Sequence, residues 1–450
     1  MQNILNTQKS ISSNRSVLAY SGVTSAKKSG GLGKHTKFCE KQAQQGFTKD
    51  KKKQDYKKLR YKTQSIIQKI MSHASGTNRV CNCLKKRIDS NLSVGISYNE
   101  SYKTASYSNL QLCDSKWICP VCSEISANQR KEELKEDLIL LEKRGFYAHM
   151  LTLTVPHSRD NSLEDTLSKL SKAKSKLFKD GLALQNEGHI TSLEVKYSSE
   201  NGWHPHLHLI VITDKKYSEH EMKGTLGVNP KNFGVLGYEK MIGMQWQKYC
   251  KSVGLKEPSL KHGVDLKRGY DDKKHSTDEL IDYILKDDLS NEMTKSHTKI
   301  GKYNTDSVTP FQLALLAENE EEHSPFAVLF REYAKAIKGK NNGKKSPKLV
   351  KLLDKIKNPI GPQLPASEDD SYSTESPVLV YELQEKEWRV LCSDHESKGK
   401  LLILIEQDIS DHGITTSKFP KADSFLNRLL EGSRGGISPA HELLKPFWVL

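Results

Sequence analysis

The sequence predicts an α+β protein with a central, largely antiparallel sheet and flanking helices, plus a small N-terminal cysteine-rich module and a small C-terminal α+β module. Three observations predict this fold class. Residues 146–264 alternate strand-like apolar runs with segments of helical period. Five of the eight cysteines fall between residues 81 and 122. A polar, acidic stretch at 366–376 precedes a last block, 378–450, that again contains strand-like runs, at 378–383, 388–392 and 401–405.

The composition indicates a polyanionic partner. The 450-residue chain has a formal net charge of +15 and a sequence pI of about 9.2, which favours nucleic acid or an anionic membrane surface. No segment approaches the ~18 consecutive apolar residues that span a bilayer, and the N-terminus lacks the apolar region of a secretory signal. We therefore expect a nucleic-acid partner, no membrane partner and a cytoplasmic location. The basic residues 1–75 are expected to be a largely disordered tail with a short helix at 58–72.

The clustered cysteines have the spacing of a metal site. Cys119 and Cys122 form a C-x-x-C unit, whose turn presents two thiolates to one tetrahedral Zn²⁺. Cys113 is the expected third ligand, and either Cys81 or Cys83 is the fourth. The simpler alternative is that free cysteines pack as small hydrophobic residues. Four protein ligands leave no open position, so we expect a structural zinc ion and an N-terminal zinc-binding module.

Helices and strands are expected to alternate after the cysteines. A charged helix should end at Gly145, because glycine is a common residue after a helix. Leucines at helical spacing predict a second helix between two strands, and Asn201-Gly202 predicts the turn into a third strand. The expected order is helix, strand, helix, strand, strand, helix and short strand, at residues 126–144, 146–155, 163–177, 188–197, 202–212, 238–253 and near 264.

The predicted strand at 202–212 carries histidines at alternate positions. Because alternate side chains of a strand share a face, His204, His206 and His208 point one way and Leu207 and Leu209 point into the core. A single strand histidine is usually a surface or satisfied core residue. Burying three imidazoles without a purpose is costly, so the row predicts a metal or phosphate site.

A predicted helix at 276–286 carries three further polar groups. Glu279, Tyr283 and Lys286 share one of its faces, a combination suited to phosphate chemistry. Each has a simpler interpretation: Glu279 completes a capping box with Ser276, Tyr283 is half-buried and Lys286 is solvated. With a pKa of about 10, a tyrosine needs a divalent metal to attack phosphorus at neutral pH. Only the helix and the histidine row together predict that reaction.

These residues together resemble the rolling-circle replication initiators of small bacterial plasmids, within the HUH endonuclease superfamily. A glutamate four residues before the tyrosine marks the single-tyrosine branch of that family, and Glu279 stands there. The resemblance spans roughly Cys81 to Lys340. The segments that carry it are His206-Leu-His208 as the HUH motif, Leu151-Thr-Leu-Thr-Val-Pro156, Tyr283-x-x-Lys286, Trp117-Ile-Cys-Pro-Val-Cys122 and Thr309-Pro-Phe-Gln-Leu313.

The resemblance implies an activity and a set of ligands. Tyr283 would nick one strand at a plasmid origin, keep the 5′ phosphate and leave a 3′-OH primer, and Glu279 would activate water in the closing step. Mg²⁺ or Mn²⁺ would be held by the HUH histidines, with Glu194 or His204 as the third ligand. The implied partners are origin DNA, single-stranded or as a hairpin, and the host helicase and polymerase.

Three other functions compete with this interpretation. A relaxase or transposase of the same superfamily would share the chemistry. The run from His204 to His208 also resembles the histidine-triad nucleotide hydrolases, which need neither the cysteines nor Tyr283. A non-catalytic zinc-containing DNA-binding protein would need neither Tyr283 nor the histidines. The predicted domains are a tail, a zinc-binding region, an HUH endonuclease domain, a linker and a C-terminal module of unknown role, at residues 1–75, 76–130, 131–345, 346–377 and 378–450.

Overall fold

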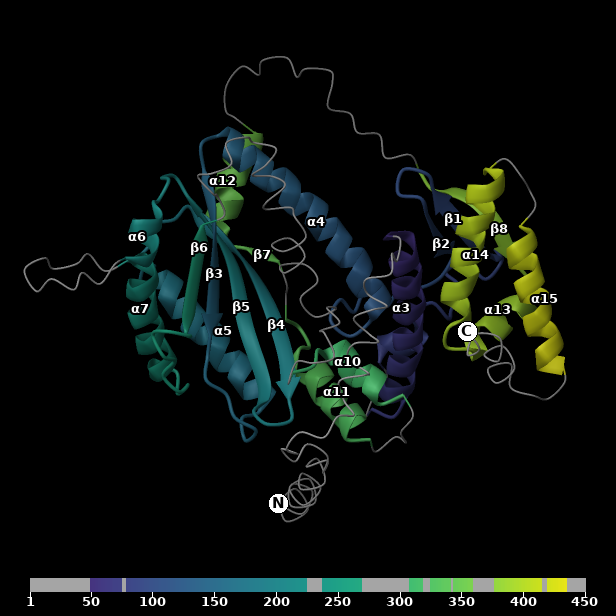
Figure 1. The fold of residues 1–450 in the computed structure, drawn as a ribbon, viewed down its shortest axis with the longest axis horizontal. Helices are drawn as coiled ribbons and strands as arrows, with labels where there is room; N and C mark the ends of the chain where they lie inside the picture. The colour runs from purple at the N-terminus through teal and green to yellow at the C-terminus, as the bar shows by residue number, and fades with distance from the viewer. Residues whose placement is uncertain are drawn as a thin grey trace, which may run out of the picture. The chain divides into compact units, whose positions relative to one another are not determined.

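The structure is a computed structural model whose described residues form two units (Figure 1). A small unit combines residues 1–65, 87–110 and 375–450, and a large unit combines residues 66–86 and 111–374. No helix among the described residues is long and apolar enough to cross a membrane. The described residues are 49–74, 78–224, 237–268, 307–318, 324–340, 343–358, 376–414 and 419–434.

A five-stranded sheet forms the centre of the large unit. Its strand order is β6-β3-β5-β4-β7, and each neighbouring pair is antiparallel. The histidine strand, β5, therefore lies between β3 and β4, and the predicted α+β fold with an antiparallel sheet is confirmed. The strands are β3 (Tyr147–Thr154), β4 (Gly188–Ser198), β5 (Gly202–Thr213), β6 (Val264–Arg268) and β7 (Lys344–Lys345).

The helices of the large unit follow the predicted order. The first ends as expected, because Gly145 adopts the left-handed φ of +81° that favours glycine after a helix. The second begins at the N-cap Ser162 and buries the leucines that predicted it. The helices include α4 (Pro120–Lys143), α5 (Leu163–Lys179), α6 (Glu219–Lys223), α7 (Tyr238–Ser252), α10 (Pro310–Leu316), α11 (Pro325–Ala336) and α12 (Pro347–Lys357), with a 3₁₀ turn at η2 (Arg79–Asn82).

Both faces of β5 are buried at its C-terminal end. Ile210 and Ile212 continue the face that carries the histidines, and they pack in one core with leucines of α4 and α12. Leu209 and Val211 are fully buried on the opposite face, and α5 packs against β5. The predicted alternation of side chains is therefore observed. The histidine face is closed by apolar residues at one end of the strand, while His204 and His206 stay partly exposed at the other.

The turn into β5 fixes its register. Gly202 has a φ of +75°, and a Cβ atom at this position would lie 2.9 Å from the Cα atom of Arg159, so glycine suits both the conformation and the space. From this turn β4 and β5 pair along their length and place Glu194 opposite His206. A slip of one residue would move the histidines to the other face.

The small unit is assembled from segments far apart in the sequence. Its three-stranded antiparallel sheet has the order β2-β1-β8, so strands that fall inside the predicted region 76–130 pair with one from the predicted C-terminal module. One helix covers the helix predicted at 58–72 and begins earlier, within the predicted tail. The elements are β1 (Val94–Asn99), β2 (Thr104–Ser108), β8 (Val378–Leu383), α13 (Glu385–Ser393), α14 (Ser397–His412) and α15 (Pro420–Arg434), with the part of α3 (Lys49–Ser72) that precedes residue 66.

Two strand predictions for the C-terminal module are wrong. The runs at 388–392 and 401–405 lie in α13 and α14. Gln384 and Glu387 form a capping box that begins α13. The run in α14 is buried at nearly every position, and a short apolar run of that kind has the same appearance in a buried helix and in a buried strand.

Candidate functional site

The three histidines of β5 form a row on one face of the sheet, which we call the histidine row. His208 is buried, whereas His204 and His206 are partly exposed. The ring centroids of His204 and His206 lie 3.8 Å apart, and those of His206 and His208 lie 6.2 Å apart. The row therefore offers imidazole nitrogens at a surface that solvent can reach.

Two threonines of β3 contact His206 and His208, the two histidines that the sequence analysis compared with the HUH motif. Thr154 is the register partner of His206 and Thr152 that of His208. In each pair the Oγ1 atom lies 3.2 Å from the histidine Nδ1 atom. A hydrogen bond at Nδ1 fixes the ring and leaves Nε2 as the nitrogen for a metal. No role was expected for these threonines from the sequence. Their alternation with buried residues in the strand before the histidine strand is the pattern that could have indicated one.

Glu194 joins the row from β4. Its Oε2 atom lies 3.2 Å from Nε2 of His208, and its Oε1 atom lies 3.1 Å from Nζ of Lys196. Burial raises the pKa of Glu194, but the hydrogen bond with His208 and the charge of Lys196 outweigh burial and lower the pKa to about 2. A buried carboxylate is therefore kept ionised beside the histidines.

Two members of the histidine row, His204 and His206, are uncharged at physiological pH. Burial lowers the pKa of His206 to about 4, against the opposing attraction of Glu194. Burial, helped by the neighbouring His206, lowers the pKa of His204 to about 3. Neutral imidazole is the form that binds metal, so neutral rings beside an ionised carboxylate are a donor set that fits a divalent cation.

His157 is a neighbour of the row that the sequence analysis did not single out. Its ring stacks on that of His204, with centroids 3.8 Å apart and an interplanar angle of 21°. The register partner of His204 on β4 is Lys196, a cation, whereas Glu194 contacts the HUH histidine His208 directly. The two candidates for a third ligand thus have different surroundings. His157 directly follows the Val155-Pro156 end of the β3 motif, which is the signal that would have found it.

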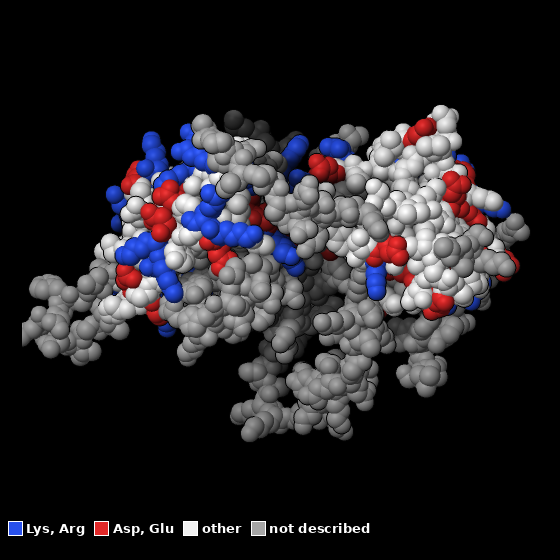
Figure 2. Space-filling view, turned by 90° about the horizontal axis from the view of Figure 1, so that it is seen from above, with Lys and Arg blue, Asp and Glu red and all other residues white. Residues whose placement is uncertain are grey.

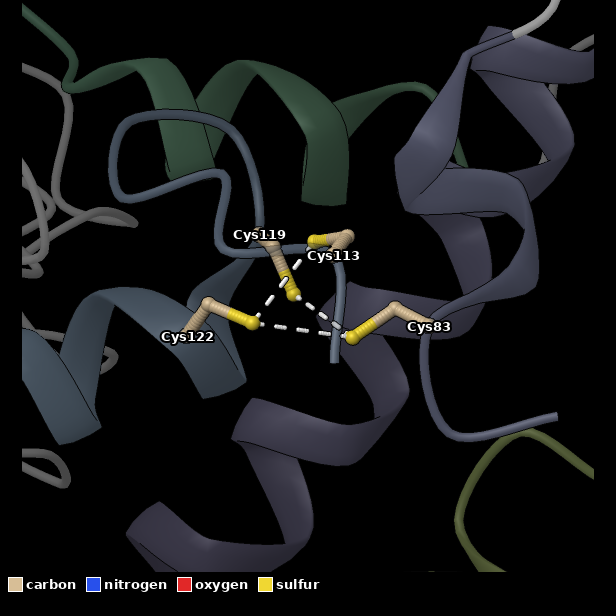
Figure 3. A group of neighbouring side chains, drawn as sticks. All are labelled: Cys83, Cys113, Cys119 and Cys122. Carbon is tan, nitrogen blue, oxygen red and sulfur yellow. Dashed lines mark hydrogen bonds between the residues drawn. The ribbon is translucent and has the colours of Figure 1, made fainter. Parts of the chain in front are cut away.

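Four cysteines of the large unit converge on one point, which we call the cysteine cluster (Figure 3). All four are buried, and their Sγ atoms lie within 4.8 Å of one another. Among the described residues, no other set of three or more potential ligands, the histidine row included, is drawn together so closely. The members are Cys83, Cys113, Cys119 and Cys122.

The structure separates the two candidates for the fourth cysteine. Cys83 follows the η2 turn and lies 3.6 Å from Cys119 and 3.7 Å from Cys122, measured between Sγ atoms. Gln68 holds this turn by donating to the carbonyl oxygens of Val80 and Cys83. Cys81 lies outside the cluster, and its Sγ atom contacts the carbonyl oxygen of Gln68 at 3.7 Å.

The cysteine cluster fits a metal ion. Burial raises the pKa of Cys119, because an apolar environment disfavours the thiolate. Four thiolates packed this closely repel one another unless a cation lies among them. Four sulfur ligands are typical of a tetrahedral structural site, so the cluster could hold a metal such as zinc.

The predicted catalytic helix lies outside the described residues. Glu279, Tyr283 and Lys286 fall in the stretch 269–306, which the structure does not describe. The described residues continue at 307–318. There Thr309 is the N-cap of α10, and it forms a capping box with Gln312.

A family model matches the part of the chain that contains the histidine row, and several known proteins are similar to parts of the chain. Residues 105–224 match a family model described as replication protein. A protein named Protein rep from Streptomyces lividans is 26% identical over 219 residues, which cover 39% of this chain and 46% of that protein. Protein rep from Streptococcus pneumoniae is 26% identical over 110 residues, covering 23% of this chain and 34% of that protein.

Each relative is matched over less than half of its length. A neomycin resistance protein from Streptomyces cyanogenus is 25% identical over 130 residues, covering 22% of this chain and 30% of that protein. No solved structure matches the chain. The predicted resemblance to rolling-circle plasmid replication initiators is confirmed.

Proposed function

We propose that this protein initiates plasmid replication by nicking one DNA strand at the origin. The observation that carries the proposal is the arrangement of His206 and His208, whose Nδ1 atoms are held by threonines, beside the ionised Glu194. The match to replication proteins over residues 105–224 supports the choice of DNA as the substrate. The proposed site of action is the cytoplasm, where the nick would recruit the host helicase and polymerase.

The proposed reaction is a transfer of a phosphodiester to tyrosine. Mg²⁺ or Mn²⁺ held by His206, His208 and Glu194 would polarise the scissile phosphate and offset the charge that develops on its oxygens. The phenolic oxygen of Tyr283 attacks phosphorus, and the bond from phosphorus to the 3′ oxygen breaks. The phenolic proton is released and the 3′ oxygen gains a proton, which leaves a 5′-phosphotyrosine and a 3′-OH primer.

Two residues near Tyr283 in sequence complete the proposal. Lys286 stabilises the phenolate or the phosphate by its charge. Glu279 takes a proton from water in the closing step, and that water releases the 5′ phosphate from Tyr283. The cysteine cluster would hold Zn²⁺ in a structural role, because four protein ligands leave no position for a substrate.

The proposal is tested by trapping the covalent intermediate. Wild type and Tyr283→Phe are incubated with single-stranded origin DNA and Mn²⁺, and the products are resolved on a denaturing gel. A protein–DNA adduct that is absent in Tyr283→Phe and in the presence of a chelator supports the proposal. Tyr303→Phe, in the same stretch of the sequence, is the matched control and should form the adduct. An adduct that survives in Tyr283→Phe would assign the nucleophile to another residue.

The role of Glu279 has a separate test in Glu279→Gln. Glutamine also completes a capping box, so this variant keeps the helix start that the simpler interpretation requires. We expect Glu279→Gln to form the adduct at the wild-type rate and to accumulate it, because water is no longer activated. Release of product at the wild-type rate would leave Glu279 with a capping role only.

A further inference from the structure

The large unit contains a hollow that neither the histidine row nor the cysteine cluster explains. It has a volume of about 710 Å³ and lies between the loop at 113–118 and the segment that follows α11. Its lining contains six lysines and arginines and one carboxylate, that of Asp114. We call it the basic pocket, and its cations are Arg79, Lys116, Arg130, Lys338, Lys340 and Lys344.

The basic pocket has little negative charge in its lining to balance its cations. On the face of the large unit seen in Figure 2, Lys and Arg side chains have Asp and Glu among them. Lys345, for example, pairs with Glu133 and Asp137. By contrast, among the described residues no carboxylate forms an ion pair with Lys338, Lys340 or Lys344. Clustered like charges repel one another, so an anionic ligand would stabilise them.

The walls of the basic pocket are tied together. The indole nitrogen of Trp117 donates to the carbonyl oxygen of Lys340 at 2.8 Å, and the hydroxyl of Tyr333 donates to the carbonyl oxygen of Trp117 at 3.4 Å. Trp117 and Tyr333 are both buried. The loop of the cysteine cluster and the segment after α11 are therefore joined through their backbone, which brings the lysines of the two walls together.

The same residues connect the basic pocket to the histidine row. The ring of Tyr333 stacks on that of Trp203, with centroids 6.1 Å apart and an interplanar angle of 27°. Trp203 directly precedes His204 in β5. The wall of the basic pocket is thus in contact, through Tyr333 and Trp203, with the strand that carries the histidines, on the face opposite to them.

We propose that the basic pocket binds the sugar-phosphate backbone of the DNA strand without reading its bases, a proposal that rests on the proposed nicking function. Lysine ammonium groups are flexible point charges that suit phosphates. The one aromatic ring in the lining, that of Trp117, is buried, so the pocket offers no exposed ring on which a base could stack. The contact should therefore be independent of sequence and sensitive to salt.

The test removes three charges from the basic pocket. The full-length variant Lys338→Gln/Lys340→Gln/Lys344→Gln is compared with Lys251→Gln/Lys256→Gln/Lys261→Gln, which removes three charges from exposed positions elsewhere in the large unit. Binding of a labelled single-stranded oligonucleotide of mixed sequence is measured by fluorescence anisotropy over a series of salt concentrations. A plot of log K against log salt has a negative slope, and each lost phosphate contact should make that slope less negative by about 0.7. The slope of the pocket variant should therefore be less negative than that of wild type by about 2, and its affinity should be about tenfold weaker. The control variant should show a smaller change in both the salt slope and the affinity.

Zinc content and adduct formation separate the possible outcomes. Equal binding by the pocket variant and the control would overturn the proposal. Loss of zinc from the pocket variant would also overturn it, because the lysines would then serve to offset the charge of the cysteine cluster. If wild type forms no Tyr283 adduct while the difference in salt slope persists, the nicking function fails and the phosphate contact stands.

Discussion

The cysteine cluster and the histidine row are both sets of side chains of types that can bind a metal, and both lie in the large unit, but they are drawn together to different degrees. The cysteines come from loops and from the first turn of α4, and their sulfur atoms all face one point. The histidines stand side by side along a strand, with Nε2 of His208 turned to Glu194. The first set could enclose a metal ion from all sides, as structural sites do, whereas the metal proposed at the second would keep positions for a substrate, as catalytic sites do.

The sharpest way to break this comparison is to remove one member of the cysteine cluster. Cys83→Ser should abolish stoichiometric zinc and unfold the surrounding loops, because a structural zinc site contributes on the order of 10 kcal/mol of binding free energy that is coupled to folding. The measurements are zinc content and thermal unfolding. Cys81→Ser is the matched control and should keep its zinc, since Cys81 lies outside the cluster. Zinc loss from both variants would contradict the assignment.

Replacing His206 should impair adduct formation and leave zinc content and stability unchanged, the reverse of the pattern expected for Cys83→Ser. His206→Ala should lower the rate of adduct formation by at least about a hundredfold, because loss even of groups that only support a metal ligand costs ten- to a hundredfold. Zinc content and the melting temperature should stay near those of wild type, since His206 is partly exposed and remote from the cluster in its contacts. A matching loss of zinc would show that the two sets are not independent.

Substitutions of Glu194 and His204, the two candidates for the third metal ligand, should have a smaller effect, confined to the Mn²⁺ concentration that adduct formation requires. Glu194→Gln keeps the size of the side chain and removes its charge, so the Mn²⁺ concentration for half-maximal adduct formation should rise by about ten- to a hundredfold. His204→Gln should raise it less, because His204 is paired across the strands with the cation Lys196, whereas Glu194 is an anion in direct contact with His208. A larger effect in His204→Gln would make His204 the ligand.

The threonines of β3 should give the smallest effect. Thr154→Val keeps the shape of the strand and removes the hydrogen bond to Nδ1 of His206, so the Mn²⁺ requirement should rise by about tenfold. The control is Thr191→Val, on strand β4, which lies on the other side of β5. The hydroxyl of Thr191 accepts a hydrogen bond from Lys174. This substitution should leave the Mn²⁺ requirement unchanged. Equal effects of the two substitutions would indicate a general disturbance of the sheet.

The sequence predicted the parts of the site that depend on local periodicity. Alternation along β5 put the histidines on one face, and Gly145 and Asn201-Gly202 marked a helix end and a turn. What the sequence left open depended on pairing between distant segments. The choice between Cys81 and Cys83 is decided by how Gln68 holds the η2 turn, and the roles of Thr152 and Thr154 follow from the register of β3 with β5.

The errors of prediction arise where periodicity gives no answer. The apolar run at 401–405 is buried on all sides in α14, so neither a period of two nor one of 3.6 is visible in it. The pairing of β1 with β8 joins residues on either side of the long segment 111–374 of the large unit, and no local pattern in the sequence encodes a partner at such a separation.

The assembly of the small unit from both ends of the chain has a practical consequence for shortening the protein. Deletion of everything after the large unit would remove β8, and β1 would become an edge strand with unpaired backbone groups beside Val94 and Ile96, which the intact unit buries. It would also leave Lys57 of α3 without Glu406 of α14, its partner in a buried ion pair. Exposed apolar edge strands promote aggregation, so a shortened protein should keep β8 and the helices that follow it.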